Sequence, residues 1–144
     1  MIRPRMLVAA ALTTLAVAAV TPAAQAGVRK QMIRKINSAR SWSHRHGVSF
    51  SGRLSRGASS WADYLMRRDM LAHSRSAISR GEGEIIEWHT GGRANVRKTV
   101  VEWLHSTSHR HVMLARGYRH AGAGRAVGYF GGRKCTIWVV RFAR

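Results

Sequence analysis

The last part of the chain, residues 122–142, carries apolar side chains on both faces of an extended backbone. Successive side chains of a strand point to opposite faces, so the apolar residues divide into Trp138, Val140 and Phe142 on one face and Ile137 and Val139 on the other. Residues 131–134, Gly-Gly-Arg-Lys, interrupt this pattern and predict the turn of a β-hairpin. Because both faces are apolar, helices are expected to cover the sheet on both sides.

The residues before this hairpin repeat their apolar side chains at intervals of three and four, the spacing of one face of an α-helix. This spacing predicts four helices, over residues 28–44, 52–70, 96–104 and 109–115. Ser51 is placed to cap the second helix, and Ser106 or Thr107 to cap the fourth. Within the second helix, Trp61 and Leu65 are expected to anchor the core.

Two segments between the helices have other patterns. Residues 74–80 are polar and are expected to form a loop, whereas residues 84–88 suit a short strand. Together with the hairpin, these elements predict an α+β fold in which a small antiparallel sheet lies between helical layers. Residues 27–144 have the length of one domain.

The N-terminal residues 1–26 have the pattern of a secretory signal peptide. Two arginines precede an apolar run over residues 6–20, and Ala24-Gln25-Ala26 supplies small residues around a cleavage point before Gly27. The alternative is an uncleaved membrane anchor, but the apolar run is shorter than the roughly 18 residues of a spanning helix. The mature domain, residues 27–144, is therefore expected to be secreted and extracellular.

The cysteine content and the charge limit how the domain is stabilised and what it binds. Cys135 is the only cysteine, so an intramolecular disulfide is excluded, and its apolar neighbours in the sequence favour a small buried residue. The net charge is +19, and removing Arg3 and Arg5 with the leader lowers it to +17. Such a charge favours an anionic wall or membrane surface as partner, although it also suits a merely arginine-rich surface. No nucleic-acid-reading motif is present, so no specific nucleic acid is expected as partner.

Three polar residues from separate segments form the candidate site: His73, Glu84 and His109. Two imidazoles and a carboxylate suit a zinc ion with an open coordination position. Without a metal, Glu84 is a candidate catalytic base beside a histidine. The chain has eight histidines, so spacing alone does not select this trio. The His-Glu-x-x-His and Gly-x-Ser-x-Gly motifs are absent.

Five short motifs follow one another along residues 27–144. They are Ile36-Asn37-Ser38-Ala39-Arg40, Trp61–Met66 with Met70–Ser74, Gly83-Glu84-Ile85-Ile86, Val100–Leu114, and Ala121–Gly124 with Trp138–Phe142. In this order they resemble the CAP superfamily, which comprises cysteine-rich secretory proteins, antigen 5 and plant pathogenesis-related 1 proteins. Each motif is weak alone, but together they cover nearly all of the mature chain. The chain therefore looks like a bacterial extracellular domain of this SCP-like type.

The resemblance implies an α-β-α sandwich with a central cleft that His73, Glu84 and His109 line. Some family members bind zinc in this cleft, which makes His73 and His109 the implied metal ligands. Glu102 is the residue nearest in sequence to the second acid of the family and would join the same cleft. Family members variously bind sterols or other lipids, act against microbes, or have been proposed as proteases.

The chain departs from the family pattern at Ile85, where asparagine is usual, and at Thr107, where proline is common. The disulfides of eukaryotic members are also absent. With no clear second acid, binding is a better expectation than catalysis. We expect a monomeric, secreted binding module, not an enzyme, whose cleft takes zinc or a small-molecule or lipid ligand. The alternatives are a metal-dependent hydrolase that uses the same cleft, and a cationic protein that binds the cell wall or a membrane surface.

Overall fold

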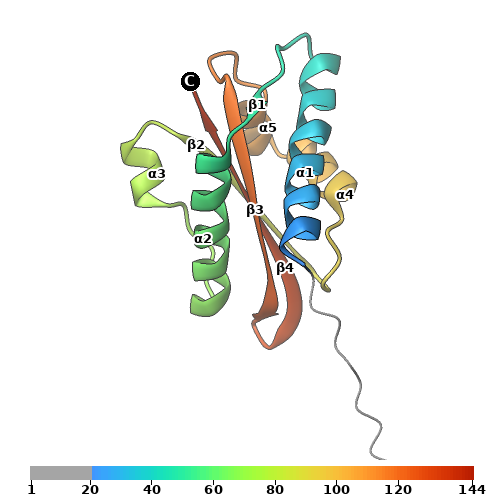
Figure 1. The fold of residues 1–144 in the computed structure, drawn as a ribbon, viewed down its shortest axis with the longest axis vertical. Coiled ribbons are helices and arrows are strands. Elements are labelled where there is room, and N and C mark those ends of the chain that lie inside the picture. Colours follow the sequence, from blue (N-terminus) through green and yellow to red (C-terminus); the bar gives the residue numbers. More distant parts are fainter. Residues whose placement is uncertain (1–20) are drawn as a thin grey trace, which may run out of the picture.

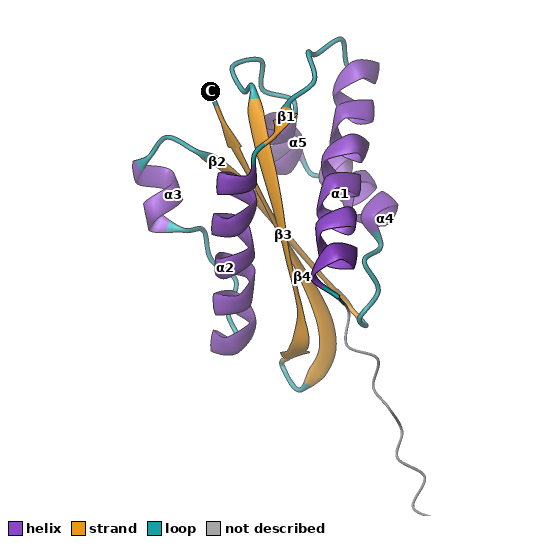
Figure 2. Cartoon of the chain, in the orientation of Figure 1, coloured by secondary structure: helices purple, strands orange, loops and turns teal. Residues whose placement is uncertain are grey.

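The computed structural model describes residues 21–144, which form helices on either side of a small sheet (Figures 1 and 2). In chain order the elements are α1 Pro22–Trp42, β1 Ser49–Phe50, α2 Gly52–Arg68, α3 Arg75–Ser79, β2 Gly83–Thr90, α4 Val96–His105, α5 Thr107–Met113, β3 His120–Phe130 and β4 Arg133–Ala143. Residues 1–20, which include the arginines and the apolar run of the expected leader, lie outside the described residues. The expected cleavage point between Ala26 and Gly27 falls within α1.

The strands follow the order β1-β3-β4-β2, so β2 lies at an edge of the sheet. The hairpin of β3 and β4 is confirmed, and β2 pairs antiparallel with β4. β1 adds two residues that pair parallel with β3, so the sheet is mixed and not purely antiparallel as expected. The hairpin turn has φ of 56° at Gly131 and 74° at Gly132, a conformation that glycine adopts without steric cost.

Helices cover both faces of the sheet, as the two apolar faces of the hairpin predicted (Figure 1). On one face α1, α4 and α5 pack against Ile85, Trp138, Val140 and Phe142. On the other face α2 packs against Ile137 and Val139. The fold is therefore an α-β-α sandwich, with an apolar core on each side of the sheet.

The α2 helix approaches β3 closely. A Cβ atom added at Gly122 or Gly124 would lie closer than 3.0 Å to backbone atoms of α2. Between these glycines, the Ala123 carbonyl accepts a hydrogen bond of 2.6 Å from Ser55 Oγ on α2. Glycine at both positions is what allows the helix to pack against this strand.

On the α2 side of the sheet one expectation was wrong and another holds only in part, since Trp61 packs against the core but at its margin. Trp61 is only partly buried, with its ring stacked on Tyr64 at 4.9 Å between centroids and its indole nitrogen donating to the Ala72 carbonyl at 2.9 Å. Leu65, by contrast, is fully buried as expected. Residues 74–80 contain the helix α3, because the Ser74 side chain accepts a hydrogen bond from the Ala77 N–H and caps a turn.

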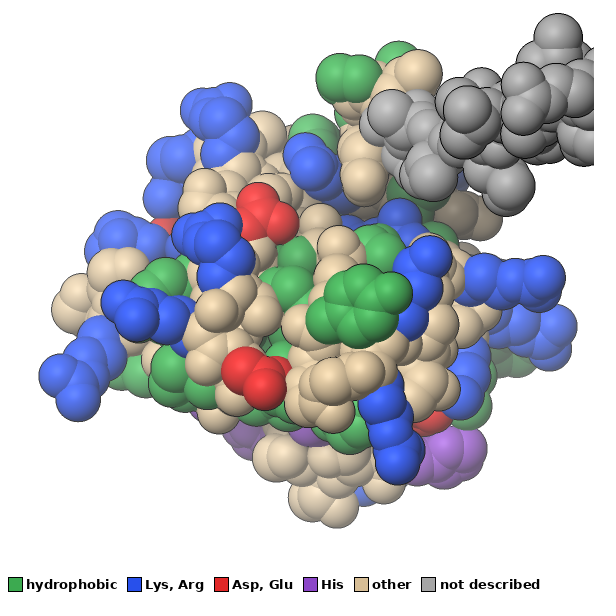
Figure 3. Space-filling view, turned by 90° about the horizontal axis from the view of Figure 1, so that it is seen from below, with side chains coloured by type: hydrophobic (Ala, Val, Ile, Leu, Met, Phe, Trp, Pro, Cys, Tyr) green, Lys and Arg blue, Asp and Glu red, His purple; other side chains and the backbone are tan. Residues whose placement is uncertain are grey.

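Smaller expectations about the Ser51 cap and the cysteine are confirmed, whereas Ser106 occupies the N-cap position of α5 without a side-chain capping hydrogen bond. Ser51 caps α2, since its Oγ accepts a hydrogen bond of 3.3 Å from the Leu54 N–H. α4 and α5 are separated at Ser106, and Cys135 is fully buried. On the face seen from the hairpin end, Lys and Arg side chains stand around the surface with few acids between them (Figure 3).

Candidate functional site

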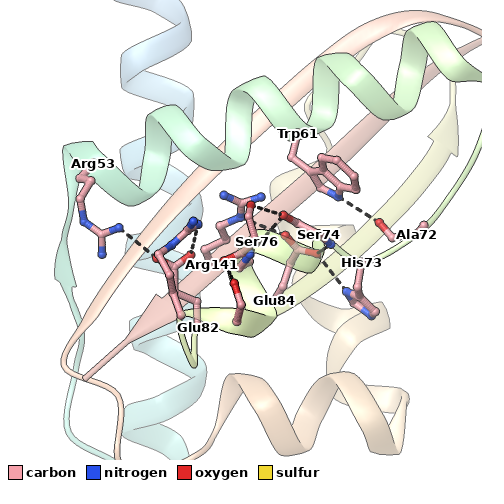
Figure 4. A network of polar contacts seen from close by, with 12 residues as sticks. Arg53, Trp61, Ala72, His73, Ser74, Ser76, Glu82, Glu84 and Arg141 are labelled. Atoms are coloured by element: carbon pink, nitrogen blue, oxygen red, sulfur yellow. Dashed lines mark hydrogen bonds and ion pairs between the residues drawn. The ribbon is translucent and has the colours of Figure 1, made fainter.

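Glu84 lies near the start of the edge strand β2 and points to the α2 side of the sheet. It shares that face with Arg141, its register partner on β4. His73 reaches Glu84 from the segment between α2 and α3, and its Nδ1 lies 3.0 Å from Glu84 Oε1 (Figure 4). Tertiary structure thus brings together two of the three residues of the predicted trio.

Both oxygens of the Glu84 carboxylate have hydrogen-bond partners. Oε1 accepts from the Ser74 N–H at 2.9 Å and contacts His73, while Oε2 accepts from Arg141 Nε at 2.9 Å. The Glu84 and Arg141 side chains are 2% and 5% exposed, so this is a buried ion pair. A carboxylate with its oxygens occupied in this way positions its neighbours and is poorly placed to take a proton from a substrate.

The His73 side chain is 53% exposed although its Nδ1 faces Glu84. A neutral histidine that donates Nδ1–H to a carboxylate keeps its free lone pair on Nε2. Glu84 therefore fixes the orientation of the ring, and Nε2 is the atom of His73 that remains open to a ligand.

His109 lies in the first turn of α5, where its Nδ1 is 2.8 Å from Ser106 Oγ. Burial lowers the pKa of His109, the neighbouring His73 lowers it further, and a hydrogen bond with the Ile86 backbone opposes both effects. Both lowering effects favour the neutral form of the ring. The helix α5 packs against β2, the edge strand that carries Glu84, so His109 lies near that edge of the sheet.

The side chains of this site do not fit a zinc ion held by three residues. Among residues 21–144, no group of three or more His, Cys, Asp or Glu side chains is arranged to hold a metal. Glu84 is committed to Arg141, which leaves His73 and His109 as donors. A catalytic zinc usually has three protein ligands, so two imidazoles alone would give an incomplete centre.

Glu102 lies in a different environment from Glu84. Its carboxylate is 3.8 Å from His89 Nδ1 and 3.6 Å from Lys98 Nζ. His89 and Glu84 are separated by an odd number of positions on β2, so their side chains face opposite sides of the sheet. The structure therefore does not bring Glu102 to the Glu84 carboxylate.

A pocket of about 450 Å³ adjoins the exposed side of His73. Its walls come from α2 and from the segment leading into α3, and they are formed by Trp61, Tyr64, Met70, Ala72, His73, Ser74, Arg75 and Ser76. The pocket thus combines aromatic and apolar surface with an oriented imidazole, which suits a small ligand more than a polymer.

Sequence reasoning missed two residues that shape this part of the molecule. Arg141 lies in the expected apolar strand, where a lone charge on a core face requires a buried partner, and that signal was available. His89 is 7% exposed on β2, and its Nε2 lies 3.2 Å from Thr99 Oγ1. Burial lowers the pKa of His89, an effect that Glu102 partly opposes. The other histidines of the described chain, His44, His46, His105, His111 and His120, are exposed.

The sequence over residues 33–142 matches the model of the family described as CAP, the cysteine-rich secretory protein family. The chain belongs to this family. The match spans the structure from α1 to β4 and so includes every residue of the candidate site. No curated protein matches the chain.

Solved structures with the same fold support the assignment of the CAP architecture. An extracellular protein containing an SCP domain from Bacillus anthracis str. Ames superposes with a TM-score of 0.64 at 17% identity, over 88% of this chain and 44% of that one. An outer surface protein from Borrelia burgdorferi superposes with a TM-score of 0.61 at 16% identity, over 80% of this chain and 91% of that one. BmVAL-1 superposes with a TM-score of 0.62 at 16% identity, over 91% of this chain and 81% of that one. The chain thus spans less than half of the Bacillus protein.

Within residues 21–144, none of the helices combines the length and the apolar character that crossing a membrane requires.

Proposed function

We propose that this CAP domain is an extracellular binding module whose pocket beside His73 takes a small ligand with an apolar part. The observation that carries the proposal is the position of the pocket next to a histidine that Glu84 holds by Nδ1. Aromatic surface from α2 would contact the apolar part of the ligand, and His73 Nε2 would contact a polar group. The volume of about 450 Å³ lies in the usual range for small-molecule sites.

The extracellular location rests on two kinds of support. The sequence of residues 1–26 has the pattern of a secretory leader. Two proteins of the same fold are described as an extracellular protein and an outer surface protein.

Binding is favoured over catalysis because the candidate base is not free. Glu84 would have to leave Arg141 and the Ser74 N–H before it could accept a proton, and the ion pair with Arg141 is buried. A metal-dependent hydrolase would also need a donor in addition to His73 and His109. We therefore propose that any zinc bound by these two imidazoles is weakly held and takes no part in hydrolysis.

The test uses the neutral fluorescent probe N-phenyl-1-naphthylamine, because a charged probe would respond to the net charge of the domain. Tyr64→Ser should weaken probe binding about tenfold, the effect of losing one well-packed apolar contact of roughly 1–2 kcal/mol. Tyr129→Ser is the matched control, because Tyr129 is 71% exposed on β3 and lies outside the pocket. Equal effects of the two substitutions, or no saturable probe binding, would refute the proposed pocket.

A further inference from the structure

A second pocket, strongly basic, lies where the end of α1 meets the segment between α5 and β3. We call it the basic pocket; it has a volume of about 230 Å³ and is lined by His44, Arg45, His46, Arg116 and Arg119. An adjoining hollow of about 350 Å³ shares Arg45 and Arg116 and adds Arg110 and His111. In Figure 1 these segments lie at the top of the molecule, at the end opposite the hairpin turn.

A buried arginine holds the backbone of both hollows by hydrogen bonds. Arg40, on α1, is 0% exposed and donates to the carbonyls of His46 at 2.8 Å, Met113 at 2.7 Å and Ala115 at 3.1 Å. His46 lines the basic pocket and Ala115 lines the adjoining hollow, so Arg40 supports the floor of each. Its Nη2 is buried without a hydrogen-bond partner in the described structure. A buried charged donor left open in this way normally has a partner.

The charges around Arg40 are not balanced by acids. Burial and the charges of Arg45 and Arg119 lower the pKa of Arg40, which indicates positive groups crowded together. No aspartate or glutamate of the described residues lines either hollow. The acids that form ion pairs in residues 21–144, Glu82, Glu84 and Glu102, do so with other partners. An anion bound in the basic pocket would relieve this repulsion.

We propose that the basic pocket binds a phosphate group. The planar fork of arginine donates two parallel hydrogen bonds to phosphate oxygens, and two exposed arginines, Arg116 and Arg119, face the same small volume. Arg45 is already held in place by a hydrogen bond from its Nε to the Leu114 carbonyl at 3.1 Å, so part of the pocket is ordered before the ligand arrives. Free phosphate and the headgroup of an anionic phospholipid share this chemistry.

Calorimetric titration of the full chain with inorganic phosphate, at constant ionic strength set with chloride, tests the pocket directly. Arg116→Gln with Arg119→Gln should weaken phosphate binding tenfold or more, since one charge-assisted hydrogen bond contributes about tenfold. The charge-matched control is Arg56→Gln with Arg67→Gln, which removes two exposed arginines from α2 and should change the affinity by less than about threefold. Arg119→Gln alone is a second test variant should the first pair fail to fold, because Arg119 lines the basic pocket.

Equal losses in the test and control variants would overturn the proposal, because the general field of the protein would then explain binding. Absence of phosphate binding by the wild type would overturn it as well. Sedimentation with phosphatidylglycerol vesicles, compared with phosphatidylcholine vesicles, distinguishes the two sources of phosphate. If Arg116→Gln with Arg119→Gln abolishes vesicle binding and the α2 control does not, the ligand is a lipid headgroup. If that variant loses binding of inorganic phosphate but binds the vesicles as the wild type does, the ligand is free phosphate.

Discussion

The buried pair of Glu84 and Arg141 offers the sharpest test of how the candidate site is built. Replacing Arg141 with methionine, an unbranched side chain of similar length, removes the charge but keeps apolar volume between α2 and the sheet. The Glu84 carboxylate, with a side chain only 2% exposed, would then be left with the Ser74 N–H and His73. An uncompensated buried charge is among the most destabilising changes a fold can suffer.

The expected loss is about 3–5 kcal/mol of the free energy of unfolding, the range for breaking a buried ion pair by removing one partner. A domain of this size is stabilised by roughly 5–15 kcal/mol in total, so the variant should fold only marginally. Glu84→Gln with Arg141→Met should recover part of the loss, because the double variant buries no unpaired charge.

Arg53→Met is the matched control. Arg53 Nη1 lies 2.9 Å from Glu82 Oε1, the same distance as in the buried pair, but the Arg53 side chain is 63% exposed. Glu82 also keeps Arg80 as a partner at 3.0 Å. An exposed pair contributes about 0–1 kcal/mol, so this variant should unfold close to the wild type.

Urea unfolding, followed by tryptophan fluorescence, measures the free energy of unfolding of the wild type, of Arg141→Met, of the double variant and of Arg53→Met. Equal slopes of this free energy against urea concentration would confirm that all four proteins unfold to a similar state. If Arg141→Met and Arg53→Met lower the free energy of unfolding equally, burial does not distinguish the two ion pairs, and Glu84 is not held as described. A double variant that is no more stable than Arg141→Met alone would likewise mean that the buried Glu84 charge is not what destabilises the single variant.

Three further predictions concern packing, pH and metal. Gly124→Ala should lower the free energy of unfolding by about 2–3 kcal/mol or more in urea, because the added Cβ would collide with the α2 backbone. A change below about 0.5 kcal/mol would contradict that contact. The pKa of His109 in the fold lies below its ordinary 6.5, so the unfolded chain binds more protons than the folded one near that pH. Stability should therefore decrease as pH falls through 6.5. The urea midpoints measured at about pH 5.5 and 7.5 should differ less in His109→Gln than in the wild type. Zinc should bind weakly through His73 and His109 in calorimetry, and an unchanged isotherm in the double alanine variant would remove both as ligands.

The sequence predicts the layers of this fold well because apolar periodicity directly records which faces are buried. Residues 137–142 alternate across a sheet that has an apolar core on each side, and this is why helices on both faces could be expected. The two-residue strand β1 could not be predicted. Ser49 and Phe50 are exposed, and their pairing with β3 depends on where the chain runs after α1.

The candidate site was less accessible to sequence reasoning because its chemistry depends on which groups are already paired. The family resemblance, and not the spacing, singles out His73, Glu84 and His109 as a group. That Glu84 is occupied follows from Arg141, which lies 57 positions away in the chain. Trp61 has the helical spacing of a core residue, yet it lines the pocket beside His73. Periodicity reports which face of the helix turns inward but does not show where that face reaches an open cavity.

Two buried arginines, Arg141 and Arg40, differ in how their charges are compensated. Arg141 is 4% exposed and its charge is neutralised by the Glu84 carboxylate, so the site near His73 carries no excess charge from this pair. Arg40 is 0% exposed and meets carbonyl oxygens, which accept hydrogen bonds but do not neutralise a full charge. Arg45 and Arg119 add to that charge. This difference in charge is consistent with the two proposals made above, a small, partly apolar ligand beside His73 and a phosphate group in the basic pocket.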